Sequence, residues 1–296
     1  MSYGFSQGAG AAAGLIAPPA PFRKPAESKK PALALAETES LTDLGNAQRF
    51  KRIFGHDLRW VPRWKRWMQW EGTHWADVEE EDVRKLAHQV SESLQDEAKT
   101  AGDSAARKAL QEHARRAKSS KDISAMLKEA RALLSASPDQ FDADGYLYNV
   151  ANGTLDFRAK DVASVFRPHR REDYVTKVVP VAWDRAAVCP RFNRFILQIF
   201  AGHQETADFV LRTMATCLVG DLVEQAYYLW FGKKGRNGKG ALQRVLNSLT
   251  DPYRVTIDPK LFFADFKYDP NSPNSAVMAL RGARLVIGSE MAKDDV

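Results

Sequence analysis

The chain has 296 residues, enough for two ordinary domains, and its 44% hydrophobic and 27% charged residues are typical of a globular protein. The net charge of +6 is compatible with a nucleic-acid partner but does not by itself indicate one. Cys189 and Cys217 have no metal or redox spacing, and no stretch is long and apolar enough to cross a bilayer, so the sequence predicts a cytoplasmic protein with reduced thiols and no membrane partner.

The first 43 residues are rich in Ala, Pro, Gly and Ser. Such a composition buries too little apolar surface to offset the entropy of ordering the chain. We therefore expect residues 1–43 to form a disordered tail.

Aromatic and basic residues are concentrated in residues 44–76, where Glu71-Gly72 between two aromatic runs predicts a hairpin. This segment holds five of the seven tryptophans: Trp60, Trp64, Trp67, Trp70 and Trp75. They could stack on bases beside the basic residues Arg63, Lys65 and Arg66, or they could fill the core of a small domain. Alternating hairpin faces need apolar filling, so we favour the core for most of them and keep the three basic residues as a DNA-binding hypothesis.

The middle of the chain alternates between helical and extended patterns. Apolar residues with helical spacing predict helices in residues 77–95, 122–136 and 189–200. Residues 105–120 read as a polar helix with a basic end, and residues 204–218 as a further helix. Between them, Asn152-Gly153 predicts a hairpin within residues 146–157, and residues 173–184 read as another extended segment. We interpret residues 44–188 as an α+β N-terminal domain.

The last block reads strand, glycine loop, helix, strand. Residues 225–231, "QAYYLWF", are apolar enough for a buried strand, residues 240–249 have a helical pattern, and "ARLVIGSE" is a short apolar strand that closes on Glu290. This order predicts an α/β core over residues 189–296.

The loop "FGKKGRNGKG", residues 231–240, is similar to the phosphate-binding pattern G-x-x-x-x-G-K-[ST] but departs from it twice. Lys233 stands where the first glycine is expected, and Gly240 replaces the Ser or Thr. Successive glycines let backbone N–H groups point into one concavity, the following helix adds its positive N-terminus, and Lys239 supplies a mobile charge. The competing interpretation is a basic glycine turn on the surface.

Glu290 offers a second nucleotide contact. Hydrolysis of a nucleoside triphosphate needs an acid at the end of a neighbouring strand, to hold Mg²⁺ or to orient the attacking water. Taken alone, an acid after an apolar strand is usually a solvated strand end.

Several pieces in order resemble the phage and plasmid primase–helicases of superfamily 3, which are related to the poxvirus nucleoside triphosphatase. The pieces are "NAQRF" with "LRWVPRWKRWMQWEGTHW", "NVANGTLDF", "FILQIFAG" with "GDLVEQAYYLWFG", "GRNGKG" and "ARLVIGSE". The resemblance covers roughly residues 45–291. It implies an α+β N-terminal domain over residues 44–188, followed over residues 189–296 by a P-loop, AAA+-like core.

The resemblance also implies a function: a ring-shaped, ATP-driven DNA helicase of replication in the cytoplasm of a bacterial host, with ATP and Mg²⁺ as cofactors. Lys239 would contact the β- and γ-phosphates, and Glu290 would serve the metal and the attacking water. The nucleotide-binding residues would be Gly232, Gly235, Arg236, Asn237, Gly238, Lys239 and Gly240. Without a hydroxyl at Gly240, Mg²⁺ would take a water as ligand in its place, and no metal bound by protein alone is expected.

The superfamily 3 core continues beyond its second nucleotide motif, with a sensor residue and an arginine finger. We therefore expect this chain to carry an incomplete core, poorly packed over residues 220–296, and the homo-oligomeric ring to be doubtful. Two other interpretations stay open: a DNA- or replisome-binding module without turnover, and an inactive prophage remnant.

Overall fold

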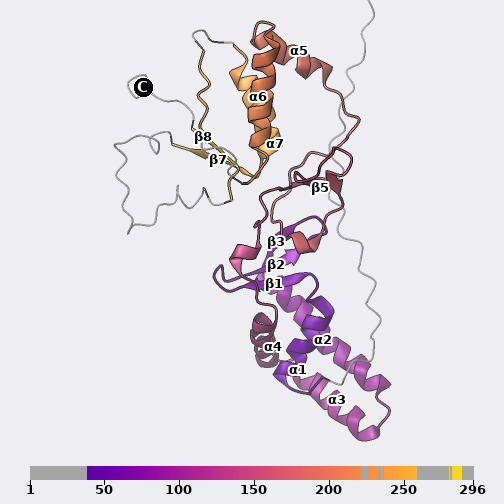
Figure 1. Ribbon diagram of the computed structural model, residues 1–296. Coiled ribbons are helices and arrows are strands. Elements are labelled where there is room, and N and C mark those ends of the chain that lie inside the picture. The colour runs from indigo at the N-terminus through magenta and orange to yellow at the C-terminus, as the bar shows by residue number, and fades with distance from the viewer. Residues whose placement is uncertain are drawn as a thin grey trace, which may run out of the picture. The chain divides into compact units, whose positions relative to one another are not determined.

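The computed structural model of the chain describes residues 39–221, 226–232, 235, 237–258, 280 and 282–288 (Figure 1). All of these lie in one compact unit, Leu35–Val296. The α-helices are α1 (Asp43–Phe54), α2 (Glu80–Thr100), α3 (Ser104–Arg116), α4 (Ser120–Leu133), α5 (Pro190–Ile199), α6 (Gln204–Thr216) and α7 (Lys239–Thr250). The strands are β1 (Leu58–Val61), β2 (Arg66–Trp70), β3 (Trp75–Val78), β4 (Leu147–Val150), β5 (Gly153–Asp156), β6 (Phe166–Arg167), β7 (Arg254–Ile257) and β8 (Leu285–Gly288). Short 3-10 turns occupy Pro138–Gln140 and Arg171–Asp173.

Helices α1, α2 and α4 pack on one another and on the antiparallel sheet β1-β2-β3. The apolar faces predicted for the second and fourth helices point inward as expected, and Val83, Val90 and Ile123 are fully buried. The core that they form also contains Ala47, Phe50, Leu58, Trp67, Ala87, Met126, Leu127, Ala130 and Leu134. Mixed helix and sheet content confirms the α+β prediction for this part of the chain.

The motif "NAQRF" lies in α1, and two of its polar residues are buried. Arg49, 2% exposed, donates to the carboxylate of Glu97 at 3.1 Å and to the main-chain oxygens of Glu39 and Ser40 at 2.8 and 3.1 Å. The side chain of Asn46 bonds His113 Nε2 at 2.9 Å. These two residues therefore tie the start of the described chain and helices α2 and α3 to α1.

The tryptophans of the first sheet are structural. Trp67 and Trp75 are each 1% exposed, and their indole N–H groups donate to Glu80 Oε2 and to the main-chain oxygen of Arg171. The remaining three are half-buried and lie in ring contacts with the others or with Phe141. The core interpretation of the tryptophans is confirmed for Trp67 and Trp75, and the hairpin predicted at Glu71-Gly72 joins β2 to β3.

The second sheet has the order β4-β5-β6. The predicted hairpin at Asn152-Gly153 is confirmed, with Val150 opposite Gly153. A Cβ at Gly153 would lie 2.5 Å from the Phe166 ring, so a side chain there would collide with β6. Residues 173–184, predicted as extended, form no strand, and their only ladder contact is one bridge from Val179 to Val150.

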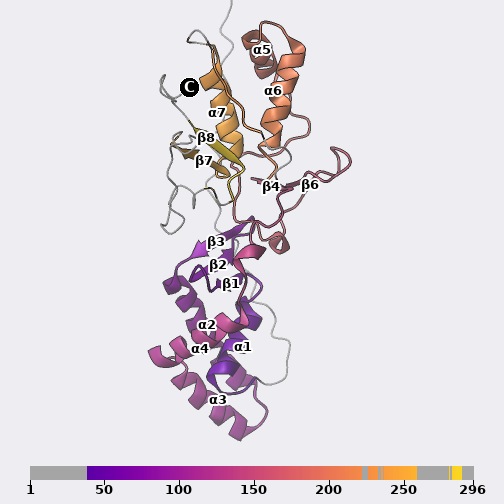
Figure 2. The same ribbon diagram turned by 60° about the vertical axis from the view of Figure 1, so that its left-hand side comes forward.

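Helices α5, α6 and α7 lie in the same part of the fold (Figure 2). They share an apolar cluster built on Ile196, Ala207, Met214, Leu242 and Leu246. The predicted strand at residues 225–231 is wrong for the part that the structure describes. Residues 226–232 lie outside any strand, and Tyr227, Leu229 and Phe231 are more than half exposed.

Residues 226–232 form no strand because they pair with none of the described strands. An apolar run forms a buried strand only when neighbouring strands take up its hydrogen bonds. Here β8, which was predicted, pairs in parallel with β7, which was not, and neither pairs with residues 226–232. The AAA+-like core therefore stays a prediction.

Candidate functional site

The glycine loop lies immediately before α7 and lines an open hollow of about 470 Å³. Of the seven residues predicted for the nucleotide site, the structure places six around it: Gly232, Gly235, Asn237, Gly238, Lys239 and Gly240. Ala241 and Arg244 complete its wall. Arg236 and Glu290 lie outside the described residues, so their predicted roles stay predictions.

Gly238 fixes the shape of the loop. It is the N-cap of α7 with φ of 84°, a left-handed conformation that favours glycine, and its carbonyl oxygen accepts from Ala241 N and Leu242 N, both at 3.0 Å. A Cβ at this position would lie 2.5 Å from Ile199 Cγ2 and 3.3 Å from the Phe195 ring. The loop is thus seated against α5, in a place that only a glycine can occupy.

The N-terminus of α7 is electrostatically open. The helix has no acid in its first turn and no side-chain cap from Gly238. The amide of Lys239 points to Asn237 Oδ1 at 3.5 Å, the long limit of a hydrogen bond. The side chain of Lys239 is exposed and makes no hydrogen bond or ion pair with the described residues. A helix N-terminus and a free ammonium group at one loop are the elements that bind phosphate.

Arg244 was missed by sequence reasoning. It stands four positions after Gly240, so both lie on one face of α7, and its Nη1 lies 3.8 Å from where a Cβ of Gly240 would be. No motif points to Arg244, because its place beside the loop depends on the face of α7. Gly240, which replaces the usual hydroxyl residue, therefore leaves space beside a second exposed cation.

The parallel pair β7–β8 precedes the acid that the sequence analysis proposed for the site. Glu290 stands two residues after the end of β8 in the sequence. The neighbouring strand β7 ends at Ile257, opposite Gly288, and is followed directly by Asp258. The carboxyl ends of parallel strands meet at one edge of a sheet, where ligands of α/β proteins bind. Asp258 thus follows a strand that ends at this edge, and no sequence motif points to it.

The basic residues predicted to contact DNA lie at the turn from β1 to β2. Arg63, Lys65 and Arg66 are all exposed. Arg66 forms an ion pair with Asp77 on β3, whereas Arg63 and Lys65 have no partner among the described residues. The turn presents two free cations, and of the tryptophans in this segment Trp67 and Trp75 are buried and offer no open ring face for a base.

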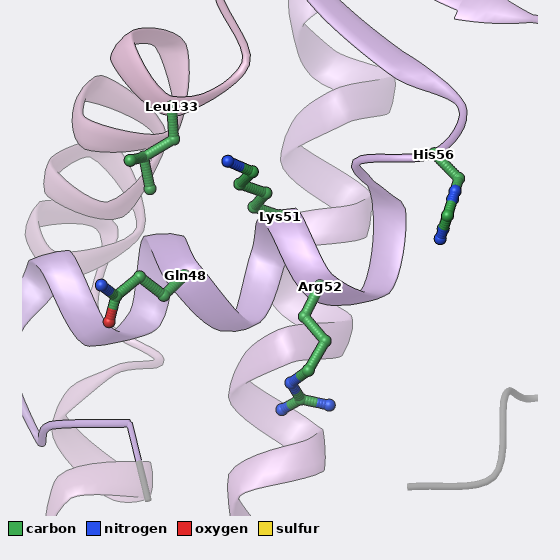
Figure 3. Close-up of a pocket in the computed structure, with 5 residues that line it drawn as sticks. All are labelled: Gln48, Lys51, Arg52, His56 and Leu133. Carbon is green, nitrogen blue, oxygen red and sulfur yellow. The ribbon is translucent and has the colours of Figure 1, made fainter. Parts of the chain in front are cut away.

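A second hollow, of about 490 Å³, lies on α1 and is lined by Gln48, Lys51, Arg52, His56 and Leu133 (Figure 3). Lys51 extends toward Leu133 on α4, while Arg52 points to the other side of α1 and is bonded to Glu39. That bond raises the pKa of Arg52 above its usual value, against the opposing effect of burial. The cations do not converge on one point, so this hollow is a weaker ligand site than the loop before α7.

In the described part of the chain, no three His, Cys, Asp or Glu side chains are grouped so that they could hold a metal ion. The described helices include none that is long and apolar enough to cross a membrane.

Residues 47–201, just over half of the chain, match the family described as "D5 N terminal like". The match begins inside α1, at Ala47 of the "NAQRF" motif, and ends after α5, before the glycine loop. No curated protein matches the chain.

Proposed function

The chain belongs to the D5 N-terminal-like family, and from this premise we propose that it is an ATP-binding part of a phage or plasmid DNA primase–helicase. The family's domain is associated with primase–helicase replication proteins. The observation that carries the nucleotide assignment is the loop of Gly238 and Lys239, because it joins a glycine-only backbone to a free lysine at an open helix N-terminus.

The residues of the loop fit a triphosphate. The first amides of α7 and the ammonium group of Lys239 would hold the β- and γ-phosphates, and Arg244 would add a second positive charge. Gly238 supports the assignment, since a Cβ there would fill the space between the loop and α5. No anion-repelling carboxylate occupies the first turn of α7.

Magnesium would reach the site with the nucleotide. With glycine at position 240, no hydroxyl is offered to the metal, so water would take that place, as Mg²⁺ readily allows. The carboxylates that we propose for the metal or for the attacking water are those of Glu290, proposed from the sequence, and of Asp258, which follows β7. In the complete protein, hydrolysis would drive DNA unwinding, and we propose a homo-oligomeric ring as the working form.

Turnover is tested by measuring phosphate release from ATP–Mg²⁺ with and without single-stranded DNA. We expect any release by the intact chain to be lost in Lys239→Ala and retained in Lys128→Ala, which removes an exposed lysine from α4 as the matched control. Release that survives Lys239→Ala would contradict the assignment of the loop.

One observation favours a second function, DNA binding without turnover: Arg63 and Lys65 are exposed and unpaired in the described structure. Removing one cation that binds a DNA phosphate should reduce the slope of log K against log salt by about 1. We expect Arg63→Ala/Lys65→Ala to lower the slope for single-stranded DNA by about 2. Arg115→Ala/Lys118→Ala, at the exposed end of α3, is the matched control. Equal slopes in both double variants would remove this turn from the DNA-binding surface.

A further inference from the structure

Arg284 lies immediately before β8 and makes hydrogen bonds to three other segments of the backbone through its side chain and its amide. Its Nη1 donates to the main-chain oxygen of Leu218, after α6, at 2.6 Å. Its Nη2 donates to the main-chain oxygen of Leu147, the first residue of β4, at 2.7 Å. The amide of Arg284 donates to the oxygen of Tyr253, just before β7, at 2.8 Å. One residue therefore joins α6, β4, β7 and β8.

Aromatic rings enclose the same guanidinium group. Its central carbon lies 4.2 Å from the centre of the Tyr253 ring and 5.9 Å from that of Tyr148. Tyr253 is 1% exposed, and burial lowers the pKa of Arg284. Among the described residues no carboxylate forms an ion pair with Arg284, so carbonyl oxygens and ring faces hold its charge. An arginine suits this role because its planar fork donates in two directions while it stacks.

Further contacts join the same segments. The Tyr148 hydroxyl donates to the oxygen of Leu249 in the last turn of α7, and the Tyr253 hydroxyl donates to the oxygen of Lys177 at 3.2 Å. Lys177 Nζ in turn donates to the oxygen of Gly282 at 2.7 Å. We call Arg284, Tyr253, Tyr148 and Lys177 the Arg284 cluster. It connects the segment that matches the family with the helix and strands that follow the glycine loop.

The backbone at this junction is also closely packed. Gly220 N donates to the oxygen of Gly145 at 2.7 Å. A Cβ at Gly145 would lie 2.6 Å from Asp221 N, and one at Gly220 would lie 2.9 Å from the Gly145 Cα. The backbones at Gly145 and Gly220 approach so closely that neither position can carry a side chain. The contact between these two segments is therefore made by the backbone itself.

We propose that Arg284 is a positioning residue that couples the nucleotide site to the family domain. It holds β8, the strand that precedes Glu290. Through Tyr253 and Tyr148, it also holds the end of α7, the helix that begins at Lys239. The strand β8 and the end of helix α7 are thereby both anchored on the hairpin β4–β5. A nucleoside triphosphate bound at the loop therefore stabilises that hairpin. This inference rests on the proposed nucleotide site.

The test is hydrogen exchange on the intact chain, with and without ATP–Mg²⁺, read at the amides of residues 147–156. We expect ATP to slow exchange there by about five-fold or more in the wild type, a typical coupling between sites. In Arg284→Met, which keeps Lys239, we expect ATP still to bind but its effect on the hairpin to fall below about two-fold. Arg284→Lys keeps the charge without the fork and should restore part of the response.

Arg254→Met is the matched control, since Arg254 lies on β7 and, among the described residues, its side chain has a hydrogen bond to Thr256 and an ion pair with Asp251, both in its own segment. It should keep the full response of the hairpin. An undiminished response in Arg284→Met would overturn the proposal, and so would an equal loss in Arg254→Met. Unchanged exchange in the core of α1, α2 and α4 excludes general unfolding as the cause of a lost response.

A failure of the nucleotide assignment gives a different result. In that case the wild type binds no ATP, and the anchor is judged from ligand-free exchange alone. Arg284→Met should then speed exchange at β4 and β8 together, relative to Arg254→Met. Unchanged exchange rates at β4 and β8 in Arg284→Met would also contradict the role of Arg284 in holding these strands.

Discussion

Arg49 in α1 and Lys239 at the start of α7 show how differently this chain uses its two basic motifs. Arg49 is almost fully buried, and its guanidinium group is held by Glu97 and by two carbonyl oxygens. Lys239 is exposed and has no partner among the described residues. The first motif completes its own hydrogen bonds within the fold, and the second leaves its charge available. A motif therefore indicates a ligand site only where the fold leaves its polar groups unsatisfied.

The surroundings of Arg49 and of Lys239 also differ in how far they are buried. Around Arg49 the helices α1, α2 and α4 enclose a continuous apolar core. Before the glycine loop, Tyr227, Leu229 and Phe231 stand exposed. The family domain has the character of a scaffold, and the chemical groups of the proposed function lie after it.

The largest effect should come from Arg49→Ala. The change removes the buried donor to two main-chain oxygens and the nearer of the two arginines that pair with Glu97, a loss that typically costs about 3–5 kcal/mol of unfolding free energy. Urea denaturation followed by tryptophan fluorescence measures it. Arg52→Ala is the control, because Arg52 is 30% exposed and its pairs with Glu39 and Glu97 should contribute less than about 1 kcal/mol. An equal loss of unfolding free energy in Arg49→Ala and Arg52→Ala would contradict the difference between a buried arginine and a surface ion pair.

Gly238→Ala sharpens the comparison on the side of the loop. A φ of 84° in a non-glycine residue and a Cβ 2.5 Å from Ile199 should cost about 1–3 kcal/mol locally. We expect faster hydrogen exchange in the first turns of α7 and weaker ATP binding, with α1 unaffected. Gly102→Ala is the matched control, since Gly102 lies outside the loop and nothing lies within 4 Å of its Cβ position. A fully active Gly238→Ala would show that the loop does not need this conformation.

The smallest effect is a pH dependence of the family domain, carried by His113. Burial, followed by the charges of Arg49 and Arg116, lowers the pKa of His113, and Asp122 and Asp43 oppose this. The unfolded chain therefore takes up the proton first as the pH falls below about 6.5, so stability is complete above that value and declines below it until the folded protein is protonated too. The pKa values of His74 and His169 are also lowered by burial and act in the same direction.

In His113→Gln we expect a shallower loss of stability between pH 7 and pH 5, measured by urea denaturation at each pH. The wild type and His88→Gln, at an exposed position of α2, provide the comparison, since each keeps His113, His74 and His169. An identical pH slope in wild type and His113→Gln would contradict the role of this histidine.

Periodic segments of the fold could be predicted from the sequence, and segments defined by distant partners could not. The helices α2 and α4 have regular apolar faces, and Val90 and Ile123 lie where the pattern puts them. Helix α1 was missed because its buried face includes the polar residues Asn46 and Arg49, whose partners are remote in sequence. The strand predicted over residues 225–231 rested on composition alone, which says nothing about pairing.

The residues of the candidate site could likewise be predicted only in part from the sequence. The glycine spacing and Lys239 could be read from the motif, and the structure brings six of its residues around one hollow. Arg244 and Arg284 could not be weighed from the motif, because their positions depend on the face of α7 and on contacts with β4 and α6. Asp258 follows a four-residue strand too short for a periodic signal.

The central claim is that ligand chemistry belongs to the loop before α7 and not to the family domain. Titration calorimetry of ATP–Mg²⁺ into the intact chain, Lys239→Ala and Lys128→Ala tests it most directly. We predict saturable binding to the intact chain and to Lys128→Ala, and a loss of affinity of at least about ten-fold in Lys239→Ala, as expected when a charged hydrogen bond to phosphate is removed. Equal affinity in all three proteins, or no binding to the intact chain, would contradict the account.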